Sequence, residues 1–99
     1  MSDETFGFAP PPFKPDEALQ RLRRELRGLG LEEREGAFER RGLRMARAAL
    51  ADGELVAAVA RQPARSPEWQ QRRIASSADL RDFVADLKKR IAGWSERDE

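Results

Sequence analysis

The sequence predicts an all-α fold: a small bundle of four to five helices with an extended Pro-rich N-terminal arm. Two observations favour this fold. Apolar residues recur at steps of three and four along most of the chain, as in amphipathic helices, and no segment alternates as a half-buried strand does. Helix start and stop signals then divide the chain into an arm over residues 1–15, a single helical domain over 16–95 and a frayed tail over 96–99.

The arm is expected to be extended, because proline blocks helix formation and favours a polyproline-like path. It carries four prolines and three aromatic residues: Pro10, Pro11, Pro12, Pro15, Phe6, Phe8 and Phe13. Two interpretations stay open. Either the aromatic residues plug into the body of the same chain, or the arm is a flexible ligand for another protein.

The first helix is predicted to begin at Asp16 and to be stopped by Gly28 and Gly30. Asp16 can cap a helix and, with Glu17, suits the positive end of the helix dipole. Glycine readily takes the left-handed conformation found just after helices. Three leucines at helical spacing form the apolar stripe: Leu19, Leu22 and Leu26.

A second helix is predicted from Glu32 to Ala51. Acidic residues crowd its start and basic residues fill its second half, as the helix dipole prefers. Gly36 and Gly42 would each cost about 1 kcal/mol relative to Ala in a helix interior. One of them is therefore expected to mark a bend.

Two short helices are predicted next, over residues 54–61 and 67–75. The Asp52-Gly53 pair is interpreted as a turn that caps the first of them. Pro67 occupies the opening position of the second, where proline is favoured because its missing N–H would have no helical partner.

The last helix, over residues 78–94, has the clearest pattern in the chain. Its apolar residues fall within about 100° of arc when they are wound at 3.6 residues per turn. They are Leu80, Phe83, Val84, Leu87, Ile91 and Trp94. This helix is expected to be the spine of the core, and because some of these residues repeat at seven, the same stripe is an alternative homodimer seam.

The composition argues against catalysis. The chain has no His, no Cys and no Tyr, so the commonest general base, the strongest nucleophile and the soft metal ligands are missing. We expect a protein that is not an enzyme and that binds no cofactor and no metal. An enzyme working through carboxylates alone would need a deep pocket lined by two or more acids.

The expected function is that of a non-catalytic protein-interaction module or accessory subunit. Its partner would be another protein or a second copy of the same chain. The apolar anchors assigned to this role are Phe6, Phe8, Phe13, Trp69 and Trp94. Trp94, near the end of the chain, is expected to be the most exposed large residue.

The alternative function is binding of nucleic acid or another polyanion. Arg40, Arg44 and Arg47 project from one face of the second predicted helix, and Arg72 and Arg73 lie on the fourth. Several guanidinium groups on one surface are what phosphate binding requires. The competing interpretation is that these side chains belong to solvated helix faces or reflect compositional bias, and both remain open.

A cytoplasmic location is expected for this chain of 99 residues with a net charge of +1. The absence of Cys rules out a disulfide framework. No apolar run approaches the roughly 18 residues of a membrane span. Residues 1–9 lack the basic start and the apolar stretch of a secretory signal. No membrane partner is expected.

Overall fold

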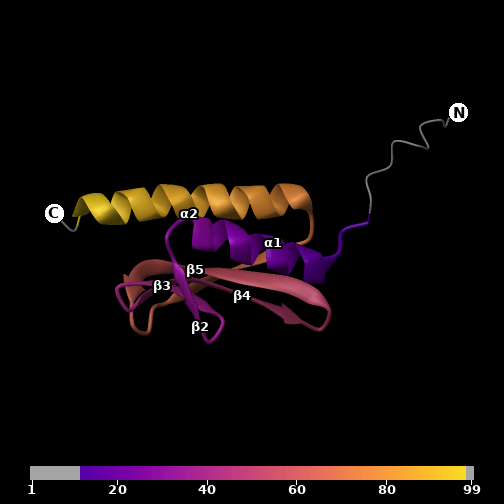
Figure 1. Ribbon diagram of the computed structural model, residues 1–99, viewed down its shortest axis with the longest axis horizontal. Coiled ribbons are helices and arrows are strands. Elements are labelled where there is room, and N and C mark those ends of the chain that lie inside the picture. The colour runs from indigo at the N-terminus through magenta and orange to yellow at the C-terminus, as the bar shows by residue number, and fades with distance from the viewer. Residues whose placement is uncertain (1–11, 98–99) are drawn as a thin grey trace, which may run out of the picture.

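The computed structural model describes residues 12–97, with side chains as far as residue 95, and shows two helices and a five-stranded antiparallel sheet (Figure 1). The elements are α1 (Pro15–Gly28), β2 (Glu32–Arg34), β3 (Ala37–Arg40), β4 (Leu43–Ala51), β5 (Glu54–Ala64), β6 (Trp69–Ile74) and α2 (Ser77–Arg97). The predicted all-α bundle of four to five helices is therefore wrong. The chain has a mixed fold, with one helix before the sheet and another after it.

The sheet is a meander, in which each strand pairs with the next one in the sequence and the order is β2-β3-β4-β5-β6. Three two-residue turns join the first four strands, and both residues of each turn have positive φ: Glu35-Gly36, Arg41-Gly42 and Asp52-Gly53. Positive φ at both positions is the requirement of a type I′ turn, whose twist matches that of the strands it connects. These short turns therefore set the register of the sheet.

The same turns explain why three of the predicted helices are absent. The segment from 32 to 51 forms β2, β3 and β4, and the glycines that a helix would accept only at a cost lie in the turns between them. The predicted helices over 54–61 and 67–75 lie within or around β5 and β6. Helix propensity is a weak preference, and here turn geometry and sheet burial outweigh it.

Small apolar residues on both faces hide the alternation of the longest strand, β5. Leu55, Ala57 and Val59 belong to the core under the helices. The residues between them on β5, Val56 and Ala58, point to the other face, because successive side chains of a strand alternate. A strand that is apolar on both faces reads as a continuous apolar run, which periodicity alone cannot assign.

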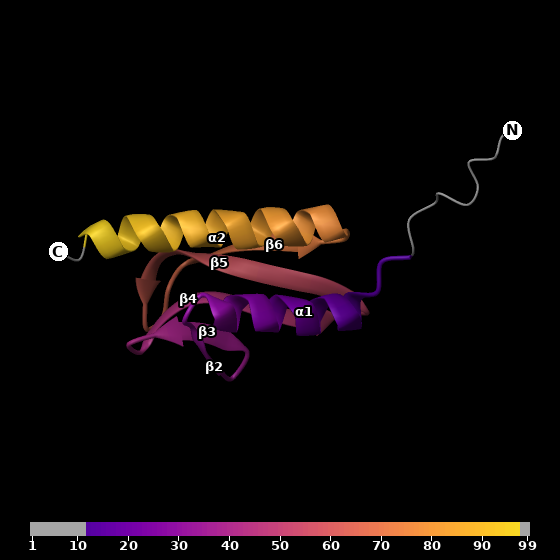
Figure 2. The same ribbon diagram turned by 45° about the horizontal axis from the view of Figure 1, so that its top comes forward.

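Both helices lie on one face of the sheet and run in the same direction (Figures 1 and 2). Helix α1 packs over β4 and β5, and α2 packs over β5 and β6. The core between the layers includes Leu22 of α1, Phe38 and Leu55 of the sheet, and Leu87 of α2, each fully buried. No helix of residues 12–97 is long and apolar enough to cross a membrane.

The first and last predicted helices are confirmed. Helix α1 begins one residue before Asp16 and ends at Gly28, while α2 contains the whole of the predicted 78–94 segment. The stripe of α2 faces the sheet, with five buried residues: Leu80, Phe83, Leu87, Ile91 and Trp94. This stripe forms the core of its own chain, as expected for the spine.

Candidate functional site

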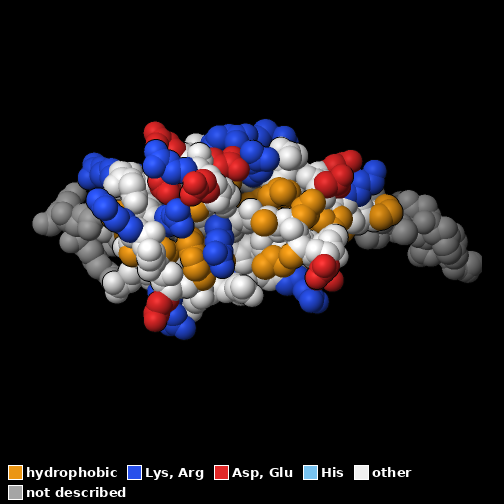
Figure 3. Space-filling view, turned by 90° about the horizontal axis from the view of Figure 1, so that it is seen from below, with side chains coloured by type: hydrophobic (Ala, Val, Ile, Leu, Met, Phe, Trp, Pro, Cys, Tyr) orange, Lys and Arg blue, Asp and Glu red, His pale blue; other side chains and the backbone are white. Residues whose placement is uncertain are grey.

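The sheet face that points away from the helices is covered by no part of the described chain (Figure 3). We call it the open face. Strand pairing and alternation place these residues there, with the charged Glu39, Arg44 and Glu54 at the margin: Ala37, Arg47, Ala49, Ala51, Val56, Ala58, Ala60, Trp69, Gln71 and Arg73. They come from β3, β4, β5 and β6, so the open face extends over four neighbouring strands.

The open face is unusually apolar for a solvated sheet. An antiparallel sheet with one face in water commonly carries polar residues on that face. Here the middle of the face is alanine and valine, with Ala49 and Ala51 exposed and Val56 half-buried. Apolar side chains run along the middle of this side of the molecule, while charged side chains gather mainly around them (Figure 3).

Arg47 and Trp69 form a raised ridge across the open face. Arg47 lies opposite Ala58 on one side of β5, and Trp69 lies opposite Ala60 on the other side. The guanidinium carbon of Arg47 is 4.8 Å from the Trp69 ring centroid, so the Arg47 side chain crosses β5. Alanine leaves room for this crossing, and Ala58 and Ala60 are left only 1% and 0% exposed.

A shallow hollow lies beside the ridge. It has a volume of about 330 Å³, and its floor is formed by Ala49, Ala51, Val56 and Ala58. The walls are made by Arg47, Gln71 and the turn between β2 and β3, which contains Glu35 and Gly36. The small floor residues account for the depth of the hollow, since larger side chains border it.

Ion pairs surround the apolar middle of the open face. Arg73 Nε lies 3.2 Å from Glu54 Oε1 at one margin. At the other margin Arg44 lies 3.4 Å from Glu39 and 3.7 Å from Glu35. The face therefore has an apolar centre and a charged margin of both signs, the arrangement found in many protein interfaces.

The five arginines of the polyanion alternative do not share one surface. Arg72 points to the helix side of the sheet, where its Nη2 lies 3.2 Å from Asp86 Oδ2, whereas the neighbouring Arg73 points to the open face. Arg40 donates a hydrogen bond of 3.1 Å to the Leu29 carbonyl. Arg44 is paired with acids, and Arg47 stacks on Trp69. Each of the five guanidinium groups therefore already has a partner within the chain.

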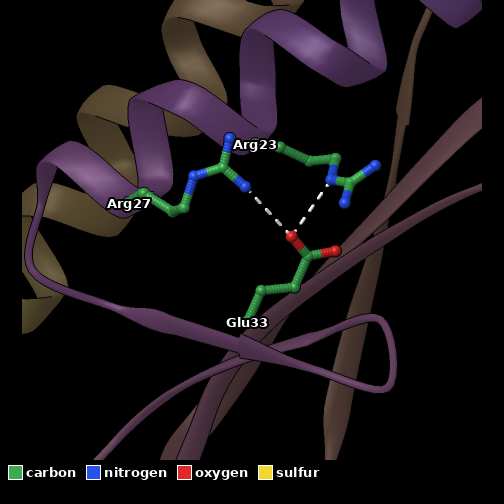
Figure 4. Close-up of polar contacts among 3 residues, drawn as sticks. All are labelled: Arg23, Arg27 and Glu33. Atoms are coloured by element: carbon green, nitrogen blue, oxygen red, sulfur yellow. Dashed lines mark hydrogen bonds and ion pairs between the residues drawn. The ribbon is translucent and has the colours of Figure 1, made fainter.

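Basic residues of α1 are also tied to the sheet. Arg23 Nε and Arg27 Nη1 lie 3.1 Å and 3.2 Å from the same oxygen of Glu33, which belongs to β2 (Figure 4). The Glu33 side chain is 22% exposed. This shared carboxylate joins the helix layer to the edge of the sheet and neutralises part of the basic surface.

The residues assigned to protein interaction are dispersed. Trp69 lies on the open face, whereas Phe13 is partly buried against the core. Trp94 is 8% exposed, so it is a core residue, and among the described residues the exposed large apolar side chain is Leu50, at 43%. Phe6 and Phe8 lie outside the described residues.

The described residues contain no group of three or more His, Cys, Asp or Glu side chains that could hold a metal ion. The open face offers an apolar surface for burial, the Trp69 ring for stacking and ion-pairing groups at its margin. The helical pattern of the sequence gave no indication of the ridge or the hollow. The turn at 52–53 could have indicated them, because a two-residue turn there places Arg47 opposite Ala58.

Comparison with protein-family models, curated proteins and solved structures finds no match to this chain.

Proposed function

We propose that the protein is a non-catalytic protein-binding module that contacts its partner through the open face. The observation that carries the proposal is the apolar centre of this face: Ala49, Ala51 and Val56 lie where a solvated sheet would carry polar residues. Exposed apolar patches that are bordered by polar residues mark interaction sites. This is the function expected from the sequence, but the surface is a sheet face that includes Trp69 and not the N-terminal arm or Trp94.

Trp69 is the proposed anchor. Its ring is half-buried and held by Arg47 at 4.8 Å, so little conformational freedom remains to be lost on binding. Tryptophan and arginine are enriched among the residues that dominate interface energetics. The proposed compartment is the cytoplasm, since a chain without cysteine suits a reducing environment.

The test is site-specific photo-crosslinking in cells that express the full chain. Benzoylphenylalanine replaces Ala49 on the open face or, as a control, Ala85 on the exposed side of α2. We expect an adduct of defined mass from position 49 and none from position 85. The variant Ala49→Glu should fail to compete for this adduct when it is co-expressed, whereas Ala85→Glu should compete as the wild type does.

Two outcomes would contradict the proposal. One is the absence of any adduct from position 49. The other is an identical set of adducts from both positions, because contact without preference for the open face is what random collision produces.

Polyanion binding is the alternative proposal, with Arg40, Arg44, Arg47, Arg72 and Arg73 as its residues. It is tested by retention of the protein on heparin at two salt concentrations. A phosphate-binding protein loses affinity steeply as salt rises, because counterions are released on binding. Absence of retention at about 50 mM salt would end this alternative.

A further inference from the structure

The open face carries a protrusion and a depression side by side. Along β5 the ridge covers Ala58 and Ala60, and the floor of the hollow begins at Val56 and Ala58. The two features meet at Ala58, and their centres are about three residues apart along the strand, or roughly 10 Å. A two-fold axis between them would place the ridge of one copy over the hollow of another. An interface of this symmetry requires a patch that carries its own complement.

The charges on the two features are opposite. The ridge ends in the Arg47 guanidinium, which forms no ion pair with any described residue. The wall of the hollow carries Glu35, whose side chain is 79% exposed and whose contact with Arg44 is long, at 3.7 Å. A two-fold axis oblique to the strands seats the ridge and also brings Arg47 toward Glu35 of the partner subunit, and the reciprocal pair forms by symmetry.

We infer that the open face binds a second copy of this chain about a two-fold axis between Val56 and Ala58. The ridge of each copy occupies the hollow of the other. The inference rests on the proposed function and names the partner of the same site. A second copy is favoured over a different protein because shape and charge on this patch are complementary to the patch itself.

The available area indicates a dimer of modest affinity. The face spans β3 to β6 and about seven residues of β5, on the order of 450 Å² per copy at about 4.8 Å between strands and about 3.3 Å per residue. The two copies together would bury about 900 Å², just below the roughly 1,000 Å² expected of a stable interface and in the range of weak contacts. We therefore expect dissociation in the micromolar range.

The experiment measures the mass of the full chain by sedimentation equilibrium from about 1 µM to about 500 µM. The wild type is expected to pass from monomer to dimer over this range. Arg47→Glu and Glu35→Arg should each raise the dissociation constant about tenfold, because each places like charges across the interface. The double variant restores both pairs in reversed order and should bind more tightly than either single variant, although Glu at position 47 no longer stacks on Trp69. Ala85→Glu serves as the control and should dimerise as the wild type does.

Circular dichroism and thermal melting establish that each variant folds. A wild type that stays monomeric at every concentration overturns the inference, as does a double variant no tighter than the singles. The crosslinker at position 49 separates this failure from failure of the proposed function. A monomer that crosslinks there to a different protein refutes only the dimer. A monomer that crosslinks to its own residues 1–11 shows that the N-terminal segment occupies the face and refutes both.

Discussion

The guanidinium group of Arg47 lies 4.8 Å from the centre of the Trp69 ring, although their strands do not pair with each other. The contact spans β5, and it exists because the residues beneath it, Ala58 and Ala60, have the smallest side chains that a strand can offer without glycine. It joins one residue assigned to protein binding and one assigned to polyanion binding. A single pair of side chains thus connects β4 and β6, the two strands that flank β5.

The Arg47–Trp69 contact should have a measurable coupling energy. Arg47→Ala, Trp69→Leu and the double variant form a thermodynamic cycle. We expect a coupling of about 0.5–1 kcal/mol, the usual range for a cation over an aromatic ring at an exposed site. The measurement is urea unfolding followed by circular dichroism at one fixed protein concentration, since association would change the apparent stability. If the stability losses of the two single variants sum to that of the double variant within about 0.3 kcal/mol, the contact contributes nothing to stability.

Gly53 and Gly93 should respond in opposite directions to the same substitution. Gly53 has φ of +76° in a turn, so Gly53→Ala should lower stability by about 1 kcal/mol, because an L-residue is strained there. Gly93 lies within α2 with nothing near an added Cβ, so Gly93→Ala should raise stability by about 0.5–1 kcal/mol. Thermal melting of the two variants tests both. If the melting temperatures of the two variants shifted equally and in the same direction, the result would argue against the turn at residues 52–53.

Gln70→Met should stabilise the protein. The Oε1 atom of Gln70 is buried and accepts no hydrogen bond from the described residues, and an unsatisfied buried acceptor costs about 1–3 kcal/mol. Methionine has a similar shape and no such acceptor, so we expect a gain of about 1 kcal/mol. Gln71→Met is the matched control, since Gln71 is exposed on the other face and should change stability by less than about 0.5 kcal/mol. Destabilisation by Gln70→Met in urea unfolding would show that the amide has a partner after all.

The same substitution, Leu to Ala, at Leu87 and at Leu50 tests the position of the core. Leu87 is fully buried under α2, so Leu87→Ala should cost about 2–5 kcal/mol through lost burial and a cavity. Leu50 is 43% exposed at the end of β4, and Leu50→Ala should cost less than about 1 kcal/mol. Chemical unfolding measures both values. Similar losses for the two variants would mean that α2 is not packed on the sheet.

The open face was hidden in the sequence by its own composition. Arg47, Ala49 and Ala51 alternate in β4 with the buried Ala46 and Ala48 and with the exposed Leu50, and β5 is apolar on both faces. A helix and a strand of this composition have similar patterns, and the high helix propensity of alanine favoured the wrong one. The Asp52-Gly53 pair by itself indicates a turn, and only the apolar runs on both sides of it indicate the centre of a hairpin.

The predicted site residues do not lie together, because most of them were placed on helices and are found on strands. Arg72 and Arg73 would lie on one broad surface of a helix, but on a strand they point to opposite faces. Trp94 appeared terminal and exposed, yet the length of α2 carries it along the helix layer into the core. Trp69 lies on the open face beside Arg47 only because β6 pairs with β5 in the observed register.

The sequence by itself determined the two terminal helices and the lack of histidine, cysteine and tyrosine chemistry. Each helix has an apolar stripe on one side, so its periodicity is a local property that needs no partner to be recognised. Only the tertiary structure decided the sheet, the ridge and the open face. Strand pairing joins residues that are distant in the sequence, and when both faces of a strand are apolar, the layer of helices above it determines which face becomes the core.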